Sequence, residues 1–190
     1  MPNAILDPTG QADRRASHAS PAPASLALAP RRTGLQGARV GLLVNTKQNA
    51  APFLVEVGRL LVERHGAVSI MARTKAAFAL PAPEGMLKEL ISECDVVITG
   101  VGDCGSCSAS AVTDGIVLEI RGIPTAAICS DAFQASADAI ASLHGAPGYR
   151  YVSTGHPVAV LTPDQVRERA RQALPEVVSL LVAGDEQSRA

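Results

Sequence analysis

The sequence predicts a single α/β domain with a doubly wound, mostly parallel sheet and helices on both of its faces. Continuous apolar runs of strand length alternate with segments whose apolar residues recur at helical spacing. These runs lack the apolar–polar alternation of a half-exposed sheet, which is typical of parallel strands covered on both faces. The chain has 190 residues, 47% of them hydrophobic, which is enough for one domain with a sizeable core.

The chain begins with a segment that should lie outside this domain. Residues 1–34 are dominated by Ala, Pro, Ser and Arg and show neither helical nor strand periodicity, so we expect a disordered arm. Within it, the segment Ile5–Pro8 can dock onto the domain or a partner subunit. The Arg14–Arg15 pair is followed by too short an apolar run for an export signal. The domain should span residues 35–183, followed by a frayed tail over 184–190.

The first half of the domain contains two strands, each followed by a helix. Apolar runs predict strands over residues 38–44 and 67–72. Asn49 is suited to cap the first helix, which carries apolar residues on one face: Phe53, Leu54, Val57, Leu60 and Leu61. A Pro-Ala-Pro loop precedes a shorter helix whose apolar face is formed by Met86, Leu87, Leu90 and Ile91.

The second half continues the same alternation. A central strand over 95–101 enters a glycine-rich turn, and a helix over about 108–121 follows, with Val112, Ile116 and Ile120 toward the sheet. The next strand covers 124–129, and Ser130 and Asp131 can cap a helix that runs through Leu143. A last strand is expected over 148–152. The capping box Thr162–Gln165 opens a final helix, which Pro175 should interrupt.

The motif Cys104-Gly105-Ser106-Cys107 lies where the central strand meets the following helix. Open α/β sheets bind ligands at this position, and a helix amino terminus stabilises a thiolate, which lowers the pKa of a cysteine. A Cys-x-x-Cys pair there is typical of a dithiol redox site. Asp103 can accept a proton or cap the turn. The alternatives are two small buried hydrophobic residues or a metal site.

Other polar residues follow strands at the same predicted edge of the sheet. Lys47 and Lys75 can bind an acidic small molecule or be solvated surface lysines, and His156 can move protons or be a plain loop residue. Asp114 lies two turns beyond Cys107, roughly 10 Å along the helix axis, and can bind Arg121, a partner subunit or a substrate amine. Cys94 is expected to be a core residue rather than a ligand.

The block Gly102–Cys107, together with Asp114, Glu119 and the Arg121–Pro124 turn, resembles the UGSC family of selenoproteins. It is more distantly similar to the selenocysteine-containing B subunits of glycine and proline reductases. The resemblance extends to Asn45–Ala50 and His156-Pro157 and covers residues 35–181. The chain departs from the family pattern at Val44, where Asp is common, and at Gln48, where Pro is common.

The resemblance implies that Cys104 stands at the selenocysteine position and Cys107 at the partner cysteine. We therefore take Cys104, Cys107, His156 and Asp103 as candidate catalytic residues. Candidate substrate-binding residues are Asn45, Lys47, Asn49, Lys75, Ser106 and Asp114. The reductase subunits work in complexes, so the resemblance also implies an oligomer, formed with copies of the chain or with a second subunit.

Composition excludes several other functions. The net charge is -1, aromatic residues make up 3% and there is no Trp, which disfavours binding to nucleic acid or an anionic membrane. No apolar run reaches the length that spans a bilayer. Neither a Gly-x-Gly-x-x-Gly fingerprint nor a phosphate-binding loop appears, so no bound nucleotide cofactor is expected. Four cysteines without a secretory signal favour a soluble protein of the reducing cytoplasm.

These observations predict a thiol-dependent enzyme that acts on a small polar molecule. Cys104 would attack as a thiolate, and Cys107 would resolve the intermediate as a disulfide. Oxidoreductase chemistry, such as reductive cleavage of a carbon–heteroatom bond, would require an external thiol or a thioredoxin-like reductant. The alternatives are a non-redox cysteine lyase or transferase, and a zinc-binding or non-catalytic subunit with Cys104, Cys107, Cys129 and His156 as ligands.

Overall fold

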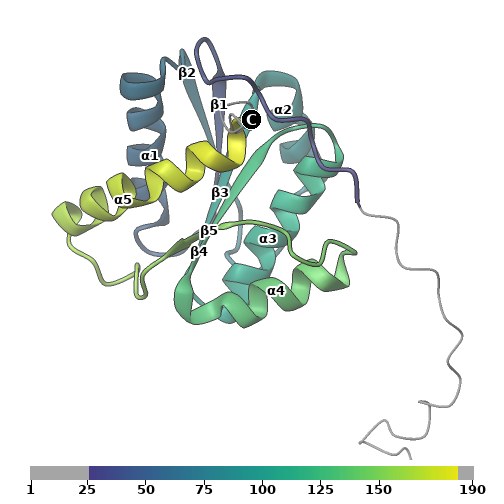
Figure 1. Ribbon diagram of the computed structural model, residues 1–190. Coiled ribbons are helices and arrows are strands. Elements are labelled where there is room, and N and C mark those ends of the chain that lie inside the picture. The colour runs from purple at the N-terminus through teal and green to yellow at the C-terminus, as the bar shows by residue number, and fades with distance from the viewer. Residues whose placement is uncertain (1–25, 184–190) are drawn as a thin grey trace, which may run out of the picture.

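The computed structural model describes residues 26–183, which form one α/β domain around a five-stranded parallel sheet (Figure 1). The strands follow the order β2-β1-β3-β4-β5. Their bounds are β1 Arg39–Val44, β2 Ser69–Thr74, β3 Val96–Gly102, β4 Thr125–Ser130 and β5 Val152–Thr154. All four pairings are parallel. The predicted fold class is thus confirmed.

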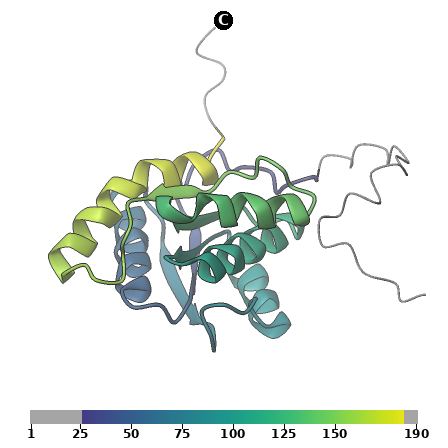
Figure 2. The same ribbon diagram turned by 90° about the horizontal axis from the view of Figure 1, so that it is seen from below.

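Helices cover both faces of the sheet (Figure 2). The helices are α1 Ala50–His65, α2 Glu84–Glu93, α3 Gly105–Ile120, α4 Gln134–Leu143 and α5 Pro163–Leu181. Helices α1 and α5 pack together on one face, and α3 packs against α4, β3 and β4 on the other. No helix within residues 26–183 is long and apolar enough to cross a membrane.

The sheet is fully buried at its centre and exposed at one edge. Every residue of β3 and β4 is buried, as continuous apolar strands predict. Strand β2 is mostly exposed, although its sequence contains Ile70 and Met71. The reason is its place in the order, because β2 pairs with β1 alone.

The final helix and the last strand differ from the sequence prediction. Helix α5 continues through Pro175, because its face with Ala173, Leu174 and Val177 is buried in the core. This packing offsets the roughly 3 kcal/mol that an interior proline costs. The last strand covers 152–154 rather than 148–152, since Gly145 and Gly148 adopt positive φ angles in the preceding turn.

Residues 26–34, expected to belong to the disordered arm, lie against the domain. The N–H of Ala29 donates to the buried carboxylate of Glu119 at 3.0 Å, and Arg32 forms a parallel bridge with Val182. These contacts join segments remote in sequence, which local composition does not reveal. The Ile5–Pro8 segment, the Arg14–Arg15 pair and the tail over 184–190 lie outside the described residues.

Candidate active site

The connection between β3 and α3 brings two glycines into close contact with their neighbours. Gly100 has a φ of 148°, and a Cβ at this residue would lie 2.8 Å from the carbonyl oxygen of Ile128. A Cβ at Gly102 would lie 2.6 Å from the Cα of Ser108. Real Cβ atoms do not approach other atoms this closely, so glycine allows the loop to pack tightly under the first turn of α3.

Cys104 and Cys107 form a disulfide at the amino end of α3, with their Cα atoms 5.2 Å apart. Helix α3 begins at Gly105, earlier than predicted, because Cys104 takes the N-cap position. Its Sγ accepts a hydrogen bond from the Cys107 N–H at 3.2 Å. Cys107 is fully buried, whereas Cys104 is half-buried. An approaching molecule therefore has better access to Cys104.

Ser106 is exposed on the first turn of α3, between the two cysteines. Its Oγ lies 3.7 Å from the Cys104 Sγ. Of the six candidate substrate-binding residues, Ser106 is therefore the one seen in direct contact with the disulfide.

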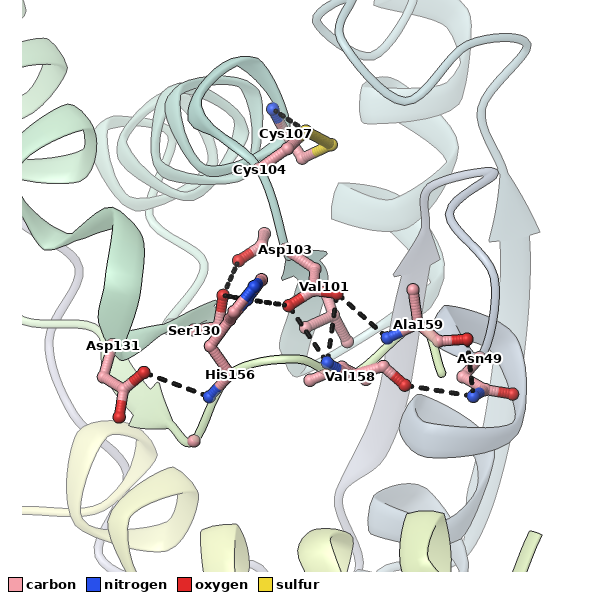
Figure 3. Close-up of polar contacts among 12 residues, drawn as sticks. Asn49, Val101, Asp103, Cys104, Cys107, Ser130, Asp131, His156, Val158 and Ala159 are labelled. Atoms are coloured by element: carbon pink, nitrogen blue, oxygen red, sulfur yellow. Dashed lines mark hydrogen bonds and ion pairs between the residues drawn. A yellow bond between two sulfur atoms is a disulfide. The ribbon is translucent and has the colours of Figure 1, made fainter. Parts of the chain in front are cut away.

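Asp103 is a buried carboxylate directly before the disulfide (Figure 3). Its Oδ2 accepts hydrogen bonds from the N–H groups of Val158 at 3.0 Å and Ala159 at 2.9 Å, and its Oδ1 lies 2.9 Å from the His156 Nδ1. Burial by itself would raise the pKa of Asp103, but the hydrogen bonds outweigh it, and the pKa lies below its usual value. Asp103 is thus an anchor for the loop that carries His156.

His156 is held on two sides and open on a third. Its ring Nδ1 is shared between Asp103 and the Ser130 Oγ, which is 3.4 Å away. Its backbone N–H donates a hydrogen bond to the Asp131 carboxylate at 3.0 Å. The Phe133 ring packs edge-on against the imidazole, with 5.2 Å between centroids. The side chain is 37% exposed. No hydrogen bond joins His156 to either sulfur in the described part of the chain, so any proton transfer must reach them through substrate or water.

Asn45 and Asn49 have their side chains occupied by the protein backbone. The Asn45 Nδ2 donates to the Val101 carbonyl at 2.8 Å, and its Oδ1 accepts from the Lys47 N–H at 3.1 Å. The Asn49 Nδ2 donates to three carbonyls of residues 158–161 rather than capping α1. These contacts tie the loop after β1 to the end of β3 and to the loop after β5. The expected role of both residues in binding substrate stays a prediction.

Lys75 and Asp114 form a buried ion pair, at 2.6 Å between Nζ and Oδ2. Their side chains are 2% and 1% exposed. The Lys75 Nζ also donates to the Ser110 Oγ and the Leu80 carbonyl. Asp114 therefore does not bind Arg121, which pairs with Glu84 instead. The Lys75 contacts hold the loop after β2 against α3, and the expected role of Lys75 in binding substrate stays a prediction.

The four proposed zinc ligands are not brought together. The Sγ of Cys129 lies beneath the first turn of α3, 3.9 Å from the Ser108 carbonyl. Burial raises its pKa to about 12. Over residues 26–183, no group of three or more His, Cys, Asp or Glu side chains is placed to hold a metal ion. Cys94 is also buried, as expected of a core residue, and its pKa is raised to about 11.

Several residues around the site were not identified from the sequence as part of it. Ser130 and Asp131 are expected to cap a helix. Instead, the Ser130 hydroxyl donates to the Gly102 carbonyl, and the Asp131 carboxylate accepts from the backbone N–H of His156. Their place directly after β4, at the same sheet edge, was a usable indication. Phe133 ends a single 3₁₀ turn, Asp131–Phe133, and Phe78 lies in a turn of the loop after β2. Both segments are too short for a periodic pattern to indicate which neighbour a side chain will contact.

Replacing Asp103 with Asn should lower the free energy of unfolding at pH 7 by about 1–3 kcal/mol. An amide cannot accept from all the donors that face this carboxylate. Because the folded pKa of Asp103 is lowered, its stabilising effect is present above the ordinary value of 3.8 and is lost as pH falls through the folded pKa. Urea unfolding at pH 7 and pH 3 should therefore show a deficit that shrinks in acid.

The exposed Asp131→Asn variant serves as the control for this measurement. Asp131 contacts one backbone N–H in the described structure, so its replacement should change stability much less. An Asp103→Asn deficit that stays constant between the two pH values would contradict the assigned pKa direction.

Comparison with known proteins gives a family but no curated relative. A family model described as the UGSC family matches residues 4–183, whereas no curated protein matches the chain. A solved structure, the crystal structure of an ABC transporter permease from the Pseudomonas fluorescens group, aligns at 15% identity with a TM-score of 0.38. The alignment covers 75% of this chain and 32% of the permease chain. So weak a likeness supports no inference. Because the family model spans nearly the whole sequence, the chain belongs to the UGSC family.

Proposed function

We propose that this protein is a dithiol enzyme in which Cys104 is the nucleophile and Cys107 the resolving thiol. The observation that carries the proposal is the Cys104–Cys107 disulfide at the amino end of α3, with its two sulfurs unequally accessible. In such pairs the accessible thiol attacks, and the buried thiol acts in the second step. The family match and the Cys-x-x-Cys motif are consistent with this chemistry.

The proposed reaction is a two-electron reduction of a small polar molecule. In the reduced protein, the Cys104 thiolate forms a bond to the substrate carbon, and the heteroatom leaves with the bonding electron pair and a proton. The Cys107 thiolate then attacks the Cys104 sulfur. The disulfide forms, and the substrate carbon departs with an electron pair and takes up a proton. A dithiol of the thioredoxin class, itself oxidised to a disulfide, would regenerate the pair.

His156 is the group proposed to supply or remove the proton. Asp103 and Ser130 surround its Nδ1, so the Nε2 is left to face the exposed side of the ring. An imidazole can both donate and accept a proton, which suits this role. Reductive cleavage of a carbon–heteroatom bond, and action in a complex with a second subunit, are finer proposals that rest on the resemblance to the reductase B subunits.

The test is the pH dependence of Cys104 alkylation by iodoacetamide in reduced Cys107→Ser protein. We expect an apparent pKa below the ordinary cysteine value of about 8.5, because the start of α3 stabilises the thiolate. Peptide mass spectrometry would identify the modified residue. Buried Cys94 and Cys129, with pKa values of about 11 and about 12, serve as internal controls that should stay unmodified.

Two results would count against the proposal. A Cys104 thiol that titrates at or above the ordinary value would show no activation by the helix. Equal modification of Cys104 and the two buried cysteines would show that its place in the fold confers no selectivity.

A further inference from the structure

Lys47 is a cation at the carboxyl edge of the sheet that has no carboxylate partner within residues 26–183. It lies in the loop after β1 and is half-buried. Its Nζ sits 5.8 Å from the centroid of the Phe78 ring, a contact that orients an ammonium group without neutralising its charge. Phe78 itself is 42% exposed, so the pair remains open to solvent.

The backbone places Lys47 and Cys104 in segments that follow two adjacent strands, at the same edge of the sheet. Strands β1 and β3 are direct neighbours, with Val44 opposite Gly100, and adjacent strands lie about 4.8 Å apart. Asn45 then joins the loop that carries Lys47 to the end of β3, because its side chain bonds both the Lys47 N–H and the Val101 carbonyl. Lys47 lies three residues after Val44, and Cys104 lies four residues after Gly100, the residue with which Val44 is paired.

The other cations near this edge are already engaged. Lys75 is paired with buried Asp114, Arg73 binds Glu89, and Arg169 donates to the Gly155 carbonyl. Among these four residues, Lys47 is therefore the one whose charged group has neither a carboxylate partner nor a hydrogen-bond acceptor within residues 26–183. It lies on the side of β3 where the Phe78 loop lies.

We propose that the substrate of the Cys104–Cys107 site is a small organic carboxylate whose charge binds the Lys47 ammonium. This inference rests on the dithiol function proposed above and adds the chemical class of its substrate. The carboxylate lies against Lys47, and the remainder of the molecule faces the half-exposed Cys104 sulfur. Lys47 is a binding residue in this assignment and takes no part in the electron transfer.

Iodoacetate and iodoacetamide provide a matched pair of probes, since they alkylate by the same reaction and differ in charge. In each case the Cys104 thiolate forms a carbon–sulfur bond and iodide leaves with the electron pair. The measured quantity is the ratio of the two rate constants in reduced Cys107→Ser protein. Lys47→Gln should lower the iodoacetate-to-iodoacetamide ratio about fivefold, the upper range for a partly exposed ion pair. High salt should lower the ratio of the parent protein in the same direction.

Two further variants make the result specific. Lys47→Arg keeps the charge and should preserve the ratio. Lys88→Gln removes an equal charge from the exposed face of α2, where Lys88 lies 3.9 Å from Glu84, and should leave the ratio unchanged. An unchanged ratio in Lys47→Gln, or an equal fall in Lys88→Gln, would overturn the proposal.

The two proposals fail in different ways. The iodoacetamide pH profile alone tests activation of Cys104, so an unshifted thiol with a Lys47-dependent ratio would reject the dithiol mechanism and retain the anion site. A lowered pKa of the Cys104 thiol, together with an iodoacetate-to-iodoacetamide ratio that does not depend on Lys47, would retain the dithiol mechanism and reject the anion site. A Cys104 that neither probe modifies would overturn both.

Discussion

Cys104→Ser should lower the rate at which the reduced protein reduces an added small-molecule disulfide by about 10³-fold or more, since it removes the attacking sulfur. Cys107→Ser should permit the first attack and block the second. The half-exposed Cys104 sulfur can then form a mixed disulfide that no buried thiol resolves. The two substitutions of one disulfide pair are thus expected to give opposite products, an unmodified protein and a trapped adduct.

The measurement mixes pre-reduced protein with bis(2-hydroxyethyl) disulfide, and released thiol and protein mass are followed over time. The parent should release two thiols for each disulfide that forms in the protein, and Cys107→Ser should release one and retain one adduct at Cys104. Cys94→Ala, at a buried residue at the end of α2, should behave like the parent. An adduct found on Cys107 in the Cys104→Ser variant would reverse the assigned roles.

The largest effect on stability is expected at the buried Lys75–Asp114 pair. Lys75→Met should lower the free energy of unfolding by about 3–5 kcal/mol, because it leaves Asp114 buried without its cation. Chemical unfolding in urea would measure the change. The loss should shrink as pH falls. Burial raises the pKa of Asp114 despite the attraction of Lys75. A carboxyl whose pKa is raised in the folded state stabilises the fold most when it is protonated, at a pH below its ordinary pKa.

Two comparisons separate the ion pair from general effects of substitution. Lys88→Met removes an exposed lysine with a weakly placed partner and should cost less than about 1 kcal/mol. The double variant Lys75→Met/Asp114→Leu removes both buried charges and should recover much of the lost stability. A double variant as unstable as Lys75→Met alone would contradict this account.

The pair also explains how the loop after β2 is positioned. Lys75 donates to the Leu80 carbonyl, and Asp114 accepts from the Ala82 N–H at 2.7 Å. Phe78, which contacts Lys47, lies between Lys75 and Leu80, in the segment that the first of these bonds closes. Lys75 and Asp114 therefore fix the loop that carries Phe78 beside Lys47, and loss of Lys75 should alter the site indirectly by moving this loop.

The strands and most helices could be predicted because each is specified by a local pattern. Central strands such as 95–101 are continuous apolar runs, and the helix from Ala50 carries its apolar residues on one face. The position of the Cys104–Cys107 pair followed from the same reasoning, since a strand followed by a helix determines where the intervening loop must lie. The predicted interruption at Pro175 is wrong, because the local cost of a proline is offset by the packing of α5 on the core, which a local pattern does not contain.

The sequence by itself therefore determined the α/β fold, the place of the dithiol at the amino end of α3, and the edge of the sheet that carries His156 and Lys47. Tertiary structure alone decided which polar residues meet. Asn45 and Asn49 bind backbone, Lys75 is neutralised by Asp114, and Asp103 holds His156. Periodicity assigns a residue to an edge or face, but the partner of a polar side chain depends on loops up to 112 residues apart in the chain. The physical reason is that buried polar groups must be satisfied wherever the packed fold offers a partner.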